Sequence, residues 1–127
     1  MSFITKEDTV LVAIDFQEKL MPAMSNGEET EERAAKLIGG MKVFDIPAIV
    51  TQQYTKGIGP TTAKIVEALG DFEHVEKTSF SAMRTQEFKD RLAATGRKNV
   101  VICGVEAHIC VLQTALQLMD EGYNVYL

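Results

Sequence analysis

The sequence has few cysteines and no long apolar run. Its 127 residues include two cysteines, Cys103 and Cys110. Two are too few for a disulfide framework, so each thiol needs its own explanation in packing or chemistry. No apolar run approaches the roughly 20 residues of a membrane-spanning helix, and the first eight residues are too mixed in polarity for a secretory signal. These absences predict a soluble, cytoplasmic protein without a membrane partner.

Positive charge is also scarce. Thirteen lysines and arginines stand against eighteen aspartates and glutamates, which gives a net charge of −5 at pH 7. Such a chain repels phosphate backbones, so we expect no nucleic-acid partner. No glycine-rich phosphate-binding motif follows the first predicted strand, which argues against a dinucleotide or a nucleoside triphosphate. The hydrophobic fraction of 46% is enough for one core, so a single domain is expected over residues 1–127.

Short β-branched runs alternate with segments of helical period. This order is typical of an α/β protein with a mainly parallel sheet. We predict strands at residues 10–14, 46–50, 74–78 and 99–103, and a fifth from residue 124. The predicted fold is a three-layer α/β/α arrangement around a Rossmann-like sheet. The last predicted helix, residues 109–121, is apolar around much of its circumference, so we expect most of it to be buried.

Three reactive or charged residues follow the predicted strands. Asp15 ends the first strand, Lys77 lies near the end of the third, and Cys110 follows the fourth after a short bend. The ligand crevice of an open parallel sheet lies outside the carboxyl ends of its strands, so these side chains are expected to meet at one edge. Cys110 also begins a predicted helix, where backbone donors and the helix dipole stabilise a thiolate. An acid, a cation and a nucleophile are therefore expected together.

Asp15 and Lys77 also have structural interpretations. Asp15 and Glu18 have the spacing of a pair that caps a short helix. Lys77 is a solvated strand charge in the simplest interpretation. Alternation, however, places it on the face opposite Glu76, and a lysine that is buried there needs a counter-charge.

The other thiol and the histidines have simpler interpretations. Cys103 lies within an apolar strand and is interpreted as a small core residue. His108 is two residues from Cys110, on a different side of a helix, so it is expected to line a pocket or to have a structural role. His74, His108 and the two cysteines lack the usual spacing of metal ligands, so no metal site is predicted.

Four segments, in this order, resemble the isochorismatase-like cysteine hydrolases, which include nicotinamidases, N-carbamoylsarcosine amidases and ureidoacrylate-type amidohydrolases. The segments are residues 10–17 (VLVAIDFQ), 76–82 (EKTSFSA), 104–115 (GVEAHICVLQTA) and 122–125 (GYNV). The first three match the positions of the family's catalytic aspartate, lysine and cysteine. Residues 51–54 (TQQY) and 56–61 (KGIGPT) are similar to a subgroup whose substrates are often unassigned.

The resemblance implies a cysteine hydrolase of a small amide or related carbonyl compound, working as a homo-oligomer. Cys110 would attack the carbonyl carbon, Asp15 would carry the thiol proton to the leaving group, and Lys77 would hold the negative charge of the pair. Water would then hydrolyse the thioester. The backbone N–H groups of Glu106 and Cys110 would bind the oxyanion, exposed by a cis peptide bond between Val105 and Glu106.

The chain departs from the family pattern in two places. Nicotinamidases carry metal-binding Asp and His residues after the second strand, where this chain has Gln52, Gln53 and Tyr54. We therefore expect no metal and no other cofactor. Family members also continue past the fifth strand with a further strand and helix, so the fold is expected to be truncated at Leu127.

The sequence leaves alternatives open for the role of three aromatic residues and for the function of the protein. Phe16, Tyr54 and Phe80 are predicted apolar walls of the substrate pocket, and ordinary core aromatics are the alternative. A second hypothesis for function is a non-catalytic or thiol-sensing member of the same fold that acts by binding a partner. A third is a flavodoxin-like nucleotide binder.

Overall fold

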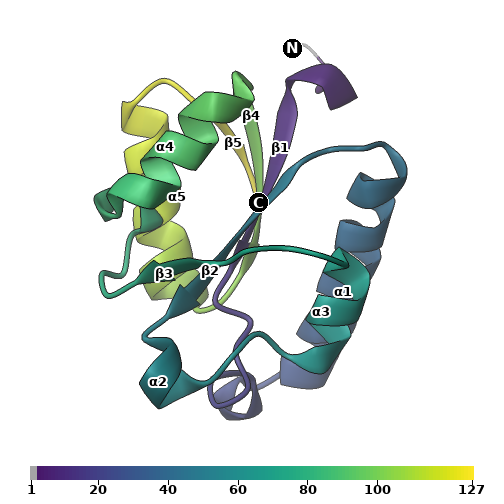
Figure 1. The fold of residues 1–127 in the computed structure, drawn as a ribbon, viewed down its shortest axis with the longest axis vertical. Helices are drawn as coiled ribbons and strands as arrows, with labels where there is room; N and C mark the ends of the chain where they lie inside the picture. The colour runs from purple at the N-terminus through teal and green to yellow at the C-terminus, as the bar shows by residue number, and fades with distance from the viewer. Residues whose placement is uncertain (1–2) are drawn as a thin grey trace.

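The computed structural model describes residues 3–127 and contains a five-stranded sheet (Figure 1). The strands are β1 (Thr9–Ile14), β2 (Ala48–Gln53), β3 (Val75–Lys77), β4 (Asn99–Gly104) and β5 (Asn124–Tyr126). Their order is β3-β2-β1-β4-β5, and every neighbouring pair is parallel. All six residues of the central strand β1 are buried, as its uninterrupted apolar run predicts.

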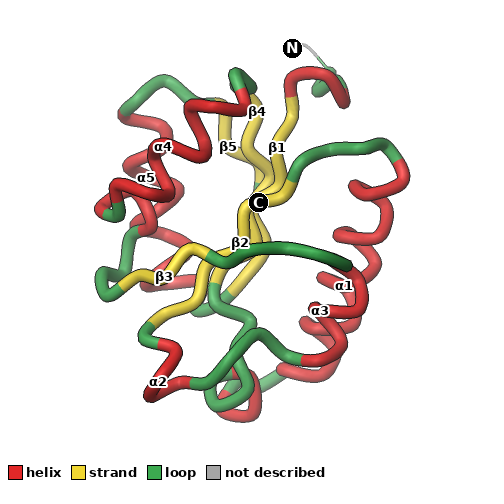
Figure 2. The backbone as a smooth tube through the Cα atoms, viewed as in Figure 1, coloured by secondary structure: helices red, strands yellow, loops and turns green. Residues whose placement is uncertain are grey.

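Helices cover both faces of this sheet. One side carries α1 (Gly27–Val43) and α3 (Ala63–Leu69), and the other carries α4 (Gln86–Thr95) and α5 (Leu112–Asp120) (Figures 1 and 2). Shorter helical pieces are α2 (Thr55–Ile58), the 3₁₀ turns Lys6–Asp8, Met21–Ala23 and Ala82–Arg84, and the π-helical turn Ala107–Val111. Each face of the sheet packs its own apolar cluster. The predicted three-layer α/β/α fold is confirmed. Within residues 3–127, no helix is long and apolar enough to cross a membrane.

The second strand lies further along the chain than predicted. It begins at Ala48 instead of residue 46 and continues past residue 50 through Thr51 to Gln52 and Gln53, two residues that the sequence predicts to begin a loop. Thr51 and Gln52 are buried. Thr51 Oγ1 donates to the Asp15 carboxylate, and Gln52 Oε1 accepts from the backbone N–H and the hydroxyl group of Thr61. The second half of this strand is polar, so a search for hydrophobic runs does not predict it.

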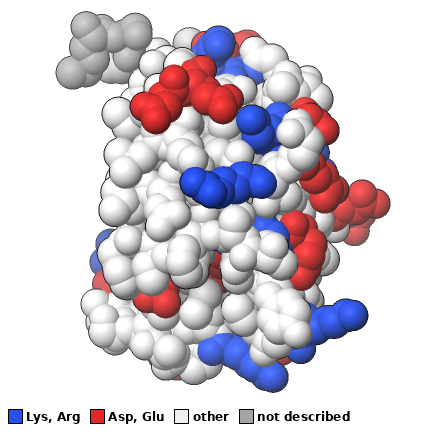
Figure 3. All heavy atoms as spheres, turned by 90° about the vertical axis from the view of Figure 1, so that its left-hand side faces the viewer, with Lys and Arg blue, Asp and Glu red and all other residues white. Residues whose placement is uncertain are grey.

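The outer side of α5 also differs from the prediction. Leu112, Leu116 and Met119 are 46%, 53% and 59% exposed, whereas Ala115 and Leu118 pack into the core. The first three follow one another at spacings of four and three residues, so they form a single apolar stripe. Figure 3 looks onto the side of the sheet that α4 and α5 cover and shows a broad area with few charged side chains. The helix is therefore buried on one side only.

Candidate active site

Asp15 directly follows β1 and turns into the site. Its backbone has φ 55°, a left-handed conformation that is uncommon for a residue other than glycine. The buried carboxylate accepts a hydrogen bond from Thr51 Oγ1 at 2.8 Å on Oδ1. Its second oxygen, Oδ2, lies 2.8 Å from Lys77 Nζ. Both oxygens are thus engaged within the site, and the alternative of a capping pair with Glu18 is wrong.

Lys77 ends β3, and its buried ammonium group is surrounded by acceptors. Besides the carboxylate of Asp15, they are Gln53 Oε1 at 2.7 Å, the carbonyl oxygens of Ser79 and Phe80 at 3.0 and 3.1 Å, and Cys110 Sγ at 3.5 Å. The counter-charge that a buried lysine requires is therefore present. The alternative of a solvated strand charge is wrong.

Cys110 lies in the π-helical turn at the start of α5, and its side chain is buried. Burial raises the pKa of this thiol above its ordinary value. The charge of Asp15 and a hydrogen bond to its carboxylate raise the pKa further, whereas the Lys77 ammonium lowers it. Burial and Asp15 thus favour the neutral thiol in the resting protein, against the thiolate that the position at a helix start predicts. A neutral thiol needs a base, and Asp15 is the carboxylate beside it.

The ends of β1 and β4 approach each other closely beside this thiol. Gly104 has φ 148°, and a Cβ on it would clash with the backbone oxygen of Ile14. The N–H of Val105 donates to that same oxygen at 3.0 Å. The next peptide bond, Val105–Glu106, is cis, as the resemblance implies. The role of the Glu106 and Cys110 N–H groups as oxyanion donors stays a prediction.

Two glutamines to which the sequence assigned no role in the site hold Lys77 in place. Gln53 accepts from the ammonium. Gln17 is fully buried, and its Nε2 donates to the carbonyl oxygens of Gln53 and Gly59 at 2.8 Å each. Gln17 Oε1 in turn accepts from the Gln53 N–H at 2.7 Å. The segment after β1 is thereby tied to the loop after β2, and the sequence signal is only that Gln17 lies two residues after Asp15.

The three predicted pocket aromatics lie in different environments. Phe16 is buried in the apolar cluster beneath α1 and α3. Tyr54 and Phe80 are each 54% exposed. The Tyr54 N–H donates to the carbonyl of Lys77 at 3.0 Å, and Phe80 lines a small pocket. The structure thus brings Tyr54 and Phe80 to Lys77 and directs Phe16 into the core; contact of any of them with a substrate stays a prediction.

The remaining thiol and the histidine lie apart from this group. Burial raises the pKa of Cys103 to about 12, and the side chain packs against the cluster under α1 and α3, in agreement with a core residue. His108 is exposed, with Nε2 3.9 Å from the Glu106 carboxylate. Among residues 3–127 there is no group of three or more His, Cys, Asp or Glu side chains able to hold a metal ion.

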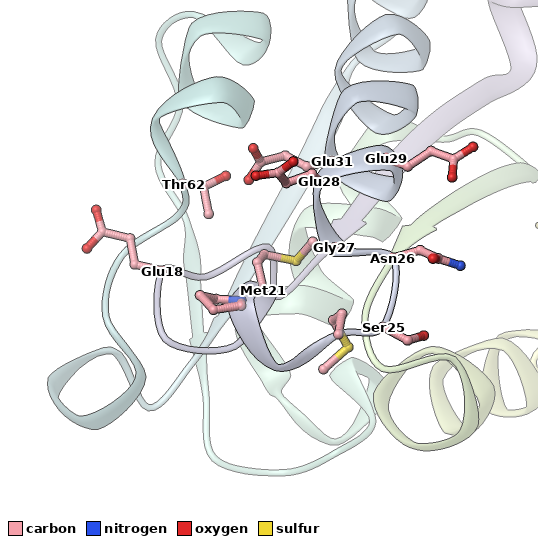
Figure 4. Close-up of a pocket in the computed structure, with 11 residues that line it drawn as sticks. Glu18, Met21, Ser25, Asn26, Gly27, Glu28, Glu29, Glu31 and Thr62 are labelled. Atoms are coloured by element: carbon pink, nitrogen blue, oxygen red, sulfur yellow. The ribbon is translucent and has the colours of Figure 1, made fainter.

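A pocket of about 720 Å³ lies beside the start of α1 (Figure 4). Its walls include Glu18, Glu28, Glu29, Glu31 and Thr62, and no residue of the Asp15–Lys77–Cys110 group lines it. Figure 4 shows the Glu28 and Glu31 side chains on the same side as Thr62. Because four carboxylates line this pocket, it repels anions, and we assign it no part in the chemistry of the thiol.

A family model, the isochorismatase domain, matches residues 9–127, and the chain belongs to this family. A similar relative is isochorismatase domain-containing protein 2 of Danio rerio, 35% identical over 98% of this chain and 62% of the relative. Another is the secreted isochorismatase effector Isc1 of Phytophthora sojae, 36% identical over 98% of this chain and 57% of the relative.

Solved structures show the same fold. The MAR1 ribonuclease from Caenorhabditis elegans has a TM-score of 0.89 and 35% identity, and covers 98% of this chain and 64% of its own. YcaC from Pseudomonas aeruginosa, solved with hexane-2,5-diol and covalent acrylamide, has a TM-score of 0.85 and 25% identity over 96% of this chain and 62% of its own. This chain thus spans between 57% and 64% of the length of these relatives.

Proposed function

We propose that this protein is a metal-independent cysteine hydrolase of a small amide or related carbonyl compound. One observation carries the proposal: the ammonium of Lys77 lies 2.8 Å from Asp15 Oδ2 and 3.5 Å from Cys110 Sγ, and all three side chains are buried. A base, a cation and a thiol at these distances form the arrangement that nucleophilic catalysis requires.

The reaction proceeds in two halves. Asp15 takes the proton of Cys110 as the sulfur attacks the carbonyl carbon, with the backbone N–H groups of Glu106 and Cys110 donating to the oxyanion. Asp15 returns the proton to the nitrogen as the C–N bond breaks, which leaves a thioester and a free amine. Water then attacks the thioester and gives one proton to the sulfur through Asp15, releasing a carboxylic acid. Lys77 offsets the negative charge that moves between carboxylate and sulfur.

The relatives support this proposal. The YcaC product of Escherichia coli, 25% identical, is described as an octameric hydrolase of unknown specificity. Acrylamide is an electrophile that combines with thiolates, so its covalent presence in the Pseudomonas aeruginosa structure supports a reactive nucleophile in this fold. The octamer and the exposed apolar stripe of α5, Leu112, Leu116 and Met119, support a homo-oligomer here as well.

The thiol-sensing alternative has less support. Sensor cysteines combine a low pKa with access to solvent, whereas Cys110 is buried and its thiol pKa is raised. The Caenorhabditis elegans relative is described as a ribonuclease. The net charge of −5 opposes RNA binding by this chain, and RNA cleavage is the competing outcome of the test.

The test uses p-nitrophenyl acetate, a panel of small amides and an unstructured RNA. We expect a burst of p-nitrophenol, amine release from at least one amide, and an acetyl group on the Cys110 peptide after acid quench, all insensitive to EDTA. Cys110→Ala abolishes these signals, whereas Cys103→Ala keeps them. Acetylation that persists in Cys110→Ala, no acyl adduct at all, or cleavage of RNA alone overturns the proposal.

A further inference from the structure

The carboxylate of Asp15 has a different partner on each oxygen. Oδ1 accepts from the hydroxyl group of Thr51, and Oδ2 lies beside the ammonium of Lys77, at 2.8 Å in both cases. Within residues 3–127, no hydroxyl, amide or backbone N–H group donates to Oδ2. Oδ1 is therefore held by a neutral donor, and Oδ2 is the oxygen left to exchange a proton beside the ammonium.

Thr51 holds Asp15 through its main chain as well. The Asp15 N–H donates to the Thr51 carbonyl oxygen at 3.2 Å, and the preceding residue, Ile14, is the partner of Thr51 in the register between β1 and β2. Asp15 leaves the strand with φ 55°, so its backbone turns while its side chain stays bonded to β2. One residue of β2 thus contacts both the main chain and the carboxylate of Asp15.

The hydroxyl group of Thr51 is not explained by packing. Thr51 follows Ile49 and Val50 in β2, and its side chain is fully buried, as is that of Asp15. Valine has nearly the same shape as threonine and would fill the same space. A buried hydroxyl group without a partner is costly, and the acceptor here is Asp15 Oδ1. The polar atom at position 51 is therefore explained by the carboxylate that it contacts.

A carboxylate needs two contacts to keep its orientation. The torsion that turns its plane is broad and roughly twofold, so one contact at Oδ2 leaves the group free to rotate. Lys77 provides the contact at Oδ2, and Thr51 provides the second at Oδ1. The ammonium of Lys77 is also 3.5 Å from Cys110 Sγ. An oxygen that is fixed beside this ammonium is thereby kept close to the thiol.

We infer that Thr51 is a positioning residue of the site. Its hydroxyl group orients the Asp15 carboxylate so that Oδ2 takes the proton of Cys110 and returns it to the leaving group. This inference rests on the proposed hydrolase function. Its consequence differs between substrates, because an amine leaves only after Asp15 returns the proton to the nitrogen, whereas a p-nitrophenolate ion leaves without a proton. Loss of the hydroxyl group therefore slows amide hydrolysis more than acylation by an activated ester.

The test compares two reactions of the same thiol: the burst with p-nitrophenyl acetate, and amine release from the amide of the panel that the unmodified protein hydrolyses fastest. We expect Thr51→Val to lower kcat for amine release about ten- to hundredfold, the range for a lost hydrogen bond to a charged group. KM stays unchanged and the burst rate falls less, so the ratio of amide to ester rates falls. Thr51→Ala, a second variant without the hydroxyl group, lowers the ratio as well. Thr51→Ser keeps the hydroxyl group and restores the ratio.

The matched control is Thr9→Val. Thr9 is also a buried strand threonine, but it lies at the other end of β1 from Asp15, and its hydroxyl group donates to the carbonyl oxygen of Thr5. This variant leaves the ratio unchanged. If the Thr51 variants slow both reactions equally, if Thr51→Ser does not restore the ratio, or if Thr9→Val lowers it as much, the inference is overturned while the proposed hydrolase stands. If the unmodified protein releases amine from no amide, the proposed function fails and the inference fails with it.

Discussion

Gln53 Oε1 accepts a hydrogen bond from Lys77 Nζ at 2.7 Å and joins β2 to β3 inside the site. The backbone of Gln53 is fixed in turn by the fully buried amide of Gln17. Because the amide oxygen carries no formal charge, the ammonium is left with one carboxylate partner, Asp15, and with the sulfur of Cys110. The charge balance at the thiol therefore depends on a neutral side chain at position 53.

Gln53→Glu tests this balance. A second carboxylate beside Lys77 weakens its stabilising effect on the thiolate, so the pKa of Cys110 rises further. We expect the midpoint of the iodoacetamide rate against pH to move upward by about one unit. Gln52→Glu adds the same charge one residue earlier, where the side chain contacts Thr55 and Thr61 instead of the ammonium, and shifts the midpoint less. Equal shifts in the two variants would show that position 53 has no special role.

Asp15→Asn separates thiol reactivity from turnover. The charge of Asp15 and its hydrogen bond with the thiol raise the pKa of Cys110, and Lys77 lowers it. Removal of the carboxylate charge lowers the thiol pKa, so alkylation at pH 7 rises about tenfold for each unit of the fall. Hydrolysis is lost at the same time, because the proton acceptor is gone. Lys77→Met has the opposite effect on alkylation. Slower alkylation of Asp15→Asn across the whole pH range would contradict this account.

Cys103 makes stability dependent on pH in the alkaline range. Its folded-state pKa is raised to about 12 from an ordinary value of 9.0. The neutral thiol is thus favoured in the folded chain, and its stabilising contribution is present below pH 9 and is lost progressively as the pH rises toward 12. We expect the free energy of unfolding to fall by up to about 1.4 kcal/mol for each pH unit in this window. Urea titrations of Cys103→Val show a smaller decline; identical slopes in the two proteins would exclude the effect.

Gly104→Ala tests the close approach of β4 to β1. The added methyl group meets the backbone of Ile14, and the φ of 148° is strained for any residue with a side chain. We expect a loss of more than about 2 kcal/mol in the free energy of unfolding, the range of the severe backbone substitutions. Gly96→Ala, at φ 65° with no atom near the new methyl group, costs about 1 kcal/mol. A loss at Gly104 no larger than at Gly96 would show that the strands have room to separate.

The sequence by itself determined the layers of the fold and the edge at which Asp15, Lys77 and Cys110 meet. Both follow from local signals: apolar runs define parallel strands, and the residues after such strands share one edge of the sheet. The sequence did not predict that the apolar stripe of α5 is exposed. Periodicity indicates which side chains of a helix are apolar, but not whether another layer covers them.

Only the tertiary structure decided how the three residues are held and charged. Gln17 and Gln53 are 36 positions apart in the chain, and nothing in the sequence around either residue indicates that the side-chain amide of Gln17 bonds to the backbone of Gln53. The pKa of Cys110 is governed by desolvation, which depends on every segment packed around the sulfur. The helix terminus visible in the sequence predicts a thiolate at Cys110, whereas burial by distant residues raises the pKa of this thiol and favours its neutral form.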